Sequence, residues 1–233
     1  MKQYEVIFAD LDGTLINTIS GKTFPKGIWD MKLNFDALDA IKKVNPKYLL
    51  IVSNQGGIES GFVDRHDFRA KSEYIARAIR EYCNCECYAM YCETNTKSDL
   101  NRKPNTGMLE NLLESYVGDD FDYIKQKSLM IGDASGKEGQ FSDSDKKTAE
   151  NFGIDYMDIK DFITELKMIY EKPSTHWIAR DITESLFLHK KRPTLNKQYG
   201  YWYSEYSVRL NDNEFPEVTF ENSPQEVELK LVN

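Results

Sequence analysis

Two aspartates, Asp10 and Asp12, follow the first apolar run of the chain and are well placed to do chemistry. Residues 4–9 are predicted to form a short buried strand, so both carboxylates lie at its carboxyl end and point to the same side. In an open α/β sheet, ligands bind at this edge. Two like charges there favour a bound cation, and carboxylate oxygens suit Mg²⁺. Because a metal-held aspartate can attack phosphorus, the pattern indicates phosphoryl transfer.

Three later segments also carry polar residues beside apolar runs. Ser53-Asn54 follows the apolar residues 49–52, and Asp133 follows the apolar residues 129–132. Between them, Arg102-Lys103-Pro104 stands at the start of a predicted helix. With Asp10-x-Asp12-Gly-Thr-Leu, these segments resemble, in order, the four motifs of the haloacid-dehalogenase-like (HAD) phosphatases. The resemblance implies an α/β fold with a parallel sheet flanked by helices, and a Mg²⁺-dependent site.

The resemblance also implies a role for each motif residue. Asp10 would be the nucleophile and Asp12 the general acid and base. Mg²⁺ would be held by the Asp10 carboxylate, the backbone carbonyl of Asp12, and Asp133. Ser53 would donate to the phosphoryl oxygens and Lys103 would neutralise the transferring group. The remaining residues expected around the phosphate are Thr14 and Asn54, with Asp145 bracing the site.

A narrower resemblance, over residues 4–165, is to the 3′-phosphatase domain of polynucleotide kinase/phosphatase. The segments that carry it are residues 15–25, 102–108, 132–137, 141–145 and 149–154. It implies removal of phosphate from the 3′ ends of DNA or RNA, as in DNA repair. Lys22, Arg102 and Lys137 are then candidates for contacts with nucleic-acid phosphates, and the alternative for each is a solvated loop charge.

The composition places limits on the class of protein. The chain of 233 residues has room for one full core and an appendage, with no apolar run long enough to span a membrane and no signal peptide. We therefore expect a cytoplasmic enzyme. A net charge of −8 favours weak, salt-sensitive binding of nucleic acid over tight binding. The sequence leaves the oligomeric state open.

Four cysteines, at positions 83, 85, 87 and 92, lie within ten residues and could form a metal knuckle. Related small-molecule phosphatases carry a zinc loop with a Cys-x-His element just before Arg-Lys-Pro. Here residues 94–101 contain neither Cys nor His. Reduced thiols around a strand are therefore the favoured interpretation.

Alternating patterns predict a mostly parallel sheet with crossover helices. The predicted strands are residues 4–9, 47–52, 87–92, 128–132 and 154–157. The predicted helices are 35–44, 65–82 capped by Asp64, one from Pro104 to 116, 144–152 capped by Ser142 or Asp143, and 159–170. The intervals between the motifs leave no room for a cap domain, and an open site favours a polymeric substrate.

Residues 171–233 are predicted to form a separate C-terminal extension after a first domain of residues 1–170. A boundary is expected at 171–174, and strands near 205–210, 217–221 and 226–232. The basic run 189–192 precedes the aromatic run 199–206. These runs could form a stacking platform for single strands. The favoured interpretation is a small antiparallel sheet that buries its aromatic residues against the catalytic domain.

The sequence therefore predicts a capless, Mg²⁺-dependent phosphatase acting on 3′-phosphorylated nucleic-acid ends. One alternative is the same chemistry on a small sugar or nucleotide phosphate, and another is a binding module with a silent site. Residues 132–138 resemble a phosphate loop but lack its spacing and its Ser or Thr. A kinase or ligase acting with this enzyme would therefore lie on another polypeptide.

Overall fold

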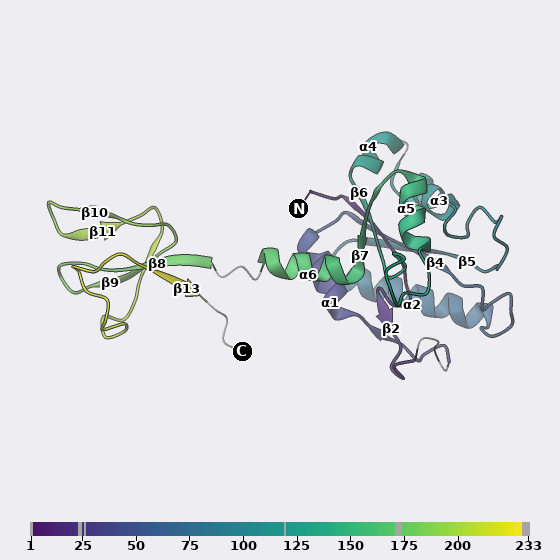
Figure 1. Ribbon diagram of the computed structural model, residues 1–233, viewed down its shortest axis with the longest axis horizontal. Helices are drawn as coiled ribbons and strands as arrows, with labels where there is room; N and C mark the ends of the chain where they lie inside the picture. Colours follow the sequence, from purple (N-terminus) through teal and green to yellow (C-terminus); the bar gives the residue numbers. More distant parts are fainter. Residues whose placement is uncertain (1, 23–24, 26, 119, 171–173, 230–233) are drawn as a thin grey trace. The chain divides into compact units, whose positions relative to one another are not determined.

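The computed structural model describes residues 2–22, 25, 27–118, 120–170 and 174–229. The chain divides into two compact units, Met1–Ile169 and Tyr170–Asn233 (Figure 1). The boundary predicted at 171–174 lies mostly outside the described residues. In the part of the chain that is described, no helix is both long enough and apolar enough to cross a membrane.

The N-terminal unit is built on a five-stranded parallel sheet in the order β5-β4-β1-β6-β7. In sheet order, the strands are β5 (Glu86–Cys92), β4 (Tyr48–Asn54), β1 (Val6–Ala9), β6 (Ser128–Gly132) and β7 (Asp155–Asp158). The chain winds outward in both directions from the central strand β1. Parallel sheets of this kind bind ligands at the carboxyl end of the strand where the winding reverses. The predicted fold class is confirmed.

Two apolar layers hold helices against the sheet. Ile7 and Ala9 of β1 belong to one cluster, and Val6 and Phe8 belong to the other, because successive side chains of a strand point to opposite faces. The first face is covered by α1 (Phe35–Val44), α2 (Arg65–Cys83) and α6 (Ile159–Tyr170). The second is covered by α3 (Gly107–Tyr116), α4 (Phe121–Gln126) and α5 (Ser144–Phe152). A short hairpin of β2 (Ile16–Asn17) and β3 (Lys32–Leu33) follows β1.

The predicted starts of the helices are only partly confirmed. Asp64 caps α2 as predicted, with its carboxylate accepting bonds from two backbone N–H groups. The helix expected from Pro104 begins instead at Gly107, whose N–H donates to the carbonyl of Leu100. That bond holds the preceding residues in a turn. Asp143 precedes α5 but pairs with Lys147 and makes no capping bond. The short helix α4 was not predicted.

The C-terminal unit consists of antiparallel sheets. Its four-stranded sheet, in order, is β12 (Ser207–Arg209), β9 (Leu186–His189), β8 (Ser174–Arg180) and β13 (Gln225–Leu229), and β10 (Thr194–Asn196) pairs with β11 (Tyr201–Tyr203). The strand predicted at 217–221 is wrong, because Val218 sits in the small core and its carbonyl accepts from the buried Arg180. Strands β8 to β11 were not predicted, and residues 230–232 of the last predicted strand lie outside the described residues.

Candidate active site

A buried ammonium group organises the carboxyl edge of the parallel sheet. Lys103 Nζ donates to Asp10 Oδ1 at 2.6 Å, to Asp145 Oδ1 at 2.7 Å and to the carbonyl of Val52 at 2.9 Å. All three of its protons are therefore used, and its side chain is almost fully enclosed. Asp10 follows β1, Lys103 lies in the loop before α3, and Asp145 lies in the first turn of α5. Buried charges need this kind of pairing, because isolation from water is costly.

Asp133, directly after β6, completes an acidic group around this lysine. Oxygens of Asp10, Asp133 and Asp145 all lie within 4.8 Å of one another, close enough to hold one metal ion. Gly13 and Gly132 make room for the group, because a Cβ at Gly13 would overlap the carboxylate of Asp133, and one at Gly132 would overlap that of Asp145. Gly13 also has a φ of +83°, in the left-handed region that glycine adopts readily.

The electrostatics of the group favour a bound cation. Burial raises the pKa of Asp10, with the charge of Asp145 adding to the effect and that of Lys103 opposing it. Burial and Asp145 raise the pKa of Asp133 to about 6, again against Lys103. Burial lowers the pKa of Lys103, but Asp10 and Asp145 outweigh it and raise that pKa overall. One ammonium among three carboxylates leaves excess negative charge, and hard oxygen donors in this arrangement fit Mg²⁺.

This excess charge predicts that stabilisation by Mg²⁺ depends on pH. Without metal, the folded protein retains protons on Asp10 and Asp133 that the unfolded chain has lost. The free energy of unfolding therefore falls as pH rises from about 4, through about 6 for Asp133 and on to about 8 for Asp10. Mg²⁺ competes with those protons. We expect a fixed Mg²⁺ concentration to raise the melting temperature more at about pH 7.5 than at about pH 5.

The Asp133→Asn variant is the control for this experiment, because it removes together one candidate metal ligand and one carboxyl group of raised pKa. Its melting temperature without metal should exceed that of wild type near neutral pH, and its response to Mg²⁺ should be small at both pH values. Equal stabilisation of the wild type at both pH values would contradict the prediction. Differential scanning fluorimetry provides the measurement.

A second network links Asp12 to Ser53. Gln55 Nε2 donates to Asp12 Oδ2 at 2.6 Å and to Ser53 Oγ at 2.8 Å. Asp12 itself is exposed, and its carboxylate lies outside the acidic group, whereas Asp10 and Ser53 are buried. The role of Gln55 was not predicted. Its position two residues after Ser53 was the available signal, because residues i and i+2 of an extended chain share a side.

The side-chain amide of Asn54 both donates a hydrogen bond to the backbone of Lys103 and accepts one from it. Its Nδ2 donates to the Lys103 carbonyl at 3.0 Å, and its Oδ1 accepts from the Lys103 N–H at 2.9 Å. Asn54 therefore fixes the loop that delivers the buried lysine. Thr14 is fully buried, and among the described residues its Oγ1 has no hydrogen-bond partner. Contacts of Asn54 and Thr14 with a substrate phosphate remain predictions.

Among the described residues, the three basic residues expected at nucleic-acid phosphates form no ion pair with Asp10, Asp133 or Asp145. Lys137 Nζ pairs with Asp161 at 2.6 Å and lies 3.7 Å from Asp158. Arg102 Nη1 donates to the carbonyl of Thr94 at 2.5 Å. Lys22 is exposed after the β2 strand. Their contacts with a substrate remain predictions, although Lys137 would first have to leave its acidic partners.

The four cysteines are free thiols and all are buried. Burial raises the pKa of the Cys87 and Cys92 thiols, as expected for reduced residues in an apolar layer. In the described ranges, the three aspartates are the only group of three or more potential metal ligands that lie close together.

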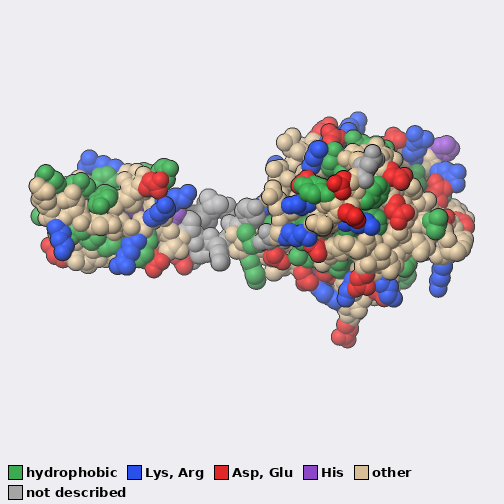
Figure 2. All heavy atoms as spheres, turned by 90° about the horizontal axis from the view of Figure 1, so that it is seen from above, with side chains coloured by type: hydrophobic (Ala, Val, Ile, Leu, Met, Phe, Trp, Pro, Cys, Tyr) green, Lys and Arg blue, Asp and Glu red, His purple; other side chains and the backbone are tan. Residues whose placement is uncertain are grey.

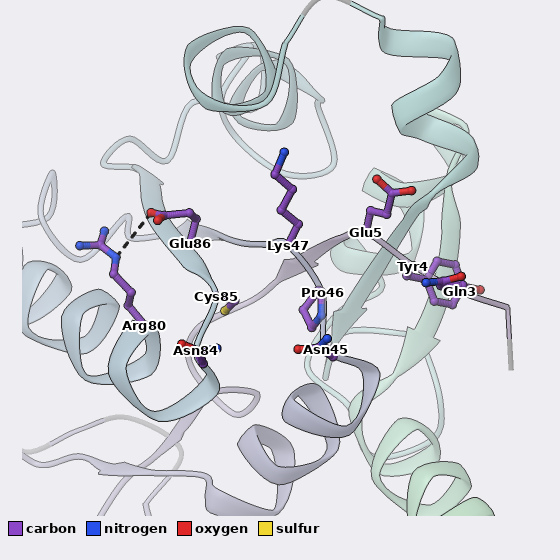
Figure 3. A pocket seen from close by; sticks show the side chains of 10 residues that line it. All are labelled: Gln3, Tyr4, Glu5, Asn45, Pro46, Lys47, Arg80, Asn84, Cys85 and Glu86. Atoms are coloured by element: carbon purple, nitrogen blue, oxygen red, sulfur yellow. Dashed lines mark ion pairs between the residues drawn. The ribbon is translucent and has the colours of Figure 1, made fainter.

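A surface pocket lies at the opposite, amino edge of the sheet (Figure 3). Tyr4 and Glu5 precede β1 and Lys47 precedes β4. On one side of the pocket, Arg80 Nε lies 3.8 Å from Glu86 Oε2. The length of the strands therefore separates this pocket from Asp10. Its lining mixes both signs of charge and contains no cluster of metal ligands among the described residues.

The fold is similar to that of a solved protein from Mesorhizobium loti assigned to the HAD-like phosphatases, with a TM-score of 0.52 and 18% identity over 71% of this chain and 85% of that one. The N-terminal unit therefore has the fold of the HAD-like phosphatases, with its acidic group at the carboxyl edge of the parallel sheet. The chain belongs to the polynucleotide kinase 3 phosphatase family, whose model matches residues 5–163.

The chain is also similar in sequence to individual proteins, among them one from a virus and one from a yeast. An uncharacterised 20.8 kDa protein of Autographa californica nuclear polyhedrosis virus is 30% identical over 70% of this chain and 87% of its own length. The bifunctional polynucleotide phosphatase/kinase of Schizosaccharomyces pombe is 34% identical over 66% of this chain. The matched region is 36% of that yeast protein, so the chain spans about a third of its length.

Proposed function

We propose that this protein is a Mg²⁺-dependent phosphatase that removes the 3′-phosphate from the ends of nucleic-acid strands. The observation that carries the proposal is that the two neighbouring aspartates differ in burial and in hydrogen-bond partner. Asp10 is buried and held at 2.6 Å by Lys103, whereas Asp12 is exposed and held at 2.6 Å by Gln55. Membership of the polynucleotide kinase 3 phosphatase family supports the choice of substrate.

The geometry suits a two-step reaction. In the first step, an Asp10 carboxylate oxygen attacks phosphorus, the bond between phosphorus and the 3′-oxygen breaks, and Asp12 gives its proton to that oxygen. In the second step, Asp12 takes a proton from water as the water oxygen attacks the aspartyl phosphate. This releases inorganic phosphate and restores Asp10. Gln55 orients Asp12 in both steps through its short hydrogen bond.

The rest of the site stabilises the charge that develops on the phosphoryl group. Lys103 fixes the Asp10 carboxylate and supplies a positive charge beside it. Ser53 lies at the end of β4, where its hydroxyl can donate to a phosphoryl oxygen. Asp10, Asp133 and the backbone carbonyl of Asp12 would hold Mg²⁺, which supplies further charge neutralisation. Asp145 accepts from both Lys103 and the Ala134 N–H, so it holds two parts of the site in place.

The rim of the site supports a polymeric substrate. The loops after β4, β5 and β6 each present an exposed large apolar side chain, namely Phe62, Leu100 and Phe141. These loops leave the same edge of the sheet as the catalytic group, because the strands are parallel. Exposed apolar side chains of this kind can contact unpaired bases next to the scissile phosphate.

This proposal predicts a preference for a polymer over a single nucleotide. Contacts beyond the scissile group supply binding energy that a mononucleotide lacks, and such energy raises kcat/KM. A 3′-phosphorylated oligonucleotide should exceed a 3′-mononucleotide by at least about tenfold in kcat/KM, which requires about 1.4 kcal/mol. The advantage should shrink as salt rises, because the contacts face solvent. Phosphate release is measured for both substrates alongside a panel of sugar and nucleotide phosphates.

The Lys22→Ala variant tests whether the flap contributes to this preference. It should reduce the oligonucleotide rate more than the mononucleotide rate, because Lys22 lies on the β2–β3 flap and outside the acidic group. Lys125→Ala, in α4 before the amino end of β6, is the matched control and should change neither rate. Equal kcat/KM for oligonucleotide and mononucleotide at low salt would exclude the nucleic-acid substrate and favour a small phosphomonoester.

A further inference from the structure

The β10–β11 hairpin of the C-terminal unit presents aromatic rings on its outer side. Trp202 is partly buried: its Nε1 is enclosed, and its ring lies 6.5 Å from that of Phe220. Tyr201 and Tyr203 flank it in the strand and therefore point the opposite way. Tyr199, in the turn before β11, is 64% exposed, and Tyr201 and Tyr203 are 40% and 53% exposed. Tyrosines that served only to build the core of this unit would be buried.

The three tyrosine rings form a continuous row. The rings of Tyr199 and Tyr201 lie 6.4 Å apart between centroids and are nearly parallel, at 17°. Those of Tyr201 and Tyr203 lie 6.2 Å apart at 64°. Asn196 stands opposite Tyr201 on β10, and its Nδ2 donates to the Tyr201 hydroxyl at 3.2 Å. The row therefore combines flat apolar faces with an amide that can bond to a base edge or a phosphate.

Basic and acidic residues of this unit are concentrated in different segments of its sequence. Residues 189–209 contain five basic residues and one acidic residue, Glu205, whereas residues 210–229 contain six acidic residues and no basic one. The basic residues are Lys190, Lys191, Arg192, Lys197 and Arg209. Figure 2 shows apolar, basic and acidic side chains together on the visible face of this unit. The segment that carries the tyrosines is thus positive, although the whole chain has a net charge of −8.

We propose that the row of Tyr199, Tyr201 and Tyr203 binds single-stranded nucleic acid by stacking on its bases, with Lys190 and Lys197 contacting its phosphates. Every base has an aromatic face, so such a row binds strands without requiring a particular sequence. The local excess of Lys and Arg suits a polyanion, and this favours nucleic acid over an apolar protein partner. The proposal goes beyond the phosphatase activity, because it assigns a second binding site to a unit outside the family match.

The test uses the full chain and a fluorescent single-stranded DNA of about 20 nucleotides that ends in a 3′-hydroxyl and so cannot be hydrolysed. A variant with Tyr199→Leu, Tyr201→Leu and Tyr203→Leu keeps apolar side chains but loses the aromatic faces. We expect at least about tenfold weaker binding by anisotropy. The corresponding triple Phe variant should bind within about twofold of wild type, because stacking needs the ring and not the hydroxyl.

Further variants and an RNA probe distinguish stacking on the tyrosines from binding elsewhere and from electrostatic attraction. Tyr123→Leu removes a similarly exposed tyrosine from α4 of the N-terminal unit and should leave affinity unchanged. Lys190→Ala with Lys197→Ala should flatten the dependence of affinity on salt. Single-stranded RNA of the same length tests whether the sugar matters. Melting curves check that each variant is folded, and the triple Phe variant keeps the test valid if the Leu variant unfolds.

The proposal is overturned if wild type and the folded triple Leu variant bind DNA and RNA equally, or if wild type binds neither. The face would then be assigned to a protein partner. Failure of the phosphatase proposal has a different signature, namely tyrosine-dependent binding without release of phosphate from 3′-phosphorylated strands. The Leu variant should hydrolyse a small chromogenic phosphate at the wild-type rate, because the tyrosines lie outside the acidic group.

Discussion

Replacing Asp10 with Asn should abolish phosphatase activity, with kcat reduced by at least about 10³-fold, while the protein remains folded. Asn preserves the size of the side chain and can still occupy the site beside Lys103, but its amide cannot form the acyl phosphate. The substitution also removes one of three crowded carboxylates. Stability without metal should therefore be unchanged or higher near neutral pH.

The measurement is steady-state release of phosphate at saturating Mg²⁺, together with urea denaturation of the same preparation. Asp122→Asn, an exposed position in the first turn of α4 near the amino edge of the sheet, is the matched control and should retain full activity. Substantial turnover by the folded Asp10→Asn protein would exclude the covalent mechanism. Loss of both activity and fold would instead show that Asp10 is needed for the structure.

Replacing Lys103 with Met should produce the largest loss of stability at the site. The ammonium is the shared partner of the Asp10 and Asp145 carboxylates, both of which are buried. Removing one partner of a buried ion pair typically costs about 3–5 kcal/mol, because the remaining charge has neither water nor a counter-ion. We expect the free energy of unfolding to fall by that amount near neutral pH, as measured by urea denaturation without metal.

Two observations would show that the loss comes from uncompensated charge. The first is a smaller loss below about pH 5. Burial keeps the Asp10 carboxyl protonated in the folded variant, and the unfolded chain takes up the same proton only as pH falls toward about 4. The second is partial recovery when Asp145→Asn is added, which removes one of the two unpaired charges. The control is Lys167→Met, which removes an exposed partner of Asp36 and should cost under about 1 kcal/mol. A similarly small loss for Lys103→Met would contradict this account of the site.

The positions of the aspartates proposed to be catalytic could be predicted from the sequence, because they depend on local pattern. Short apolar runs predicted the strands that precede Asp10, Ser53 and Asp133, and the carboxyl ends of parallel strands share one edge of a sheet. No contact needs to be known for that inference. The same local logic predicted the cap of α2 by Asp64, since the side chain bonds to backbone groups two and three residues away.

The partners of charged side chains could not be predicted in this way. Lys103 meets Asp10 across 93 residues of sequence and Asp145 across 42, so only packing of the loop before α3 against the sheet decides this pairing. The ion pair of Lys137 with Asp161 was likewise not predicted, and the expected contact of Lys137 with a phosphate remains a prediction. Many acidic residues lie within reach of a flexible lysine, and its sequence neighbours do not determine which one it contacts.

The C-terminal unit was least predictable because its strands are short and its stabilising contacts are distant in sequence. Arg180 donates to carbonyls of Glu184, Asp212, Glu214, Phe215 and Val218. A buried guanidinium of this kind leaves no periodic signal in the sequence. By itself, the sequence determined which residues lie at the carboxyl edge of the parallel sheet, because apolar runs and the alternation of strands and helices along the chain are local properties. The tertiary structure alone decided which charges meet there and which tyrosines of the C-terminal unit face outward, because both depend on contacts between distant segments.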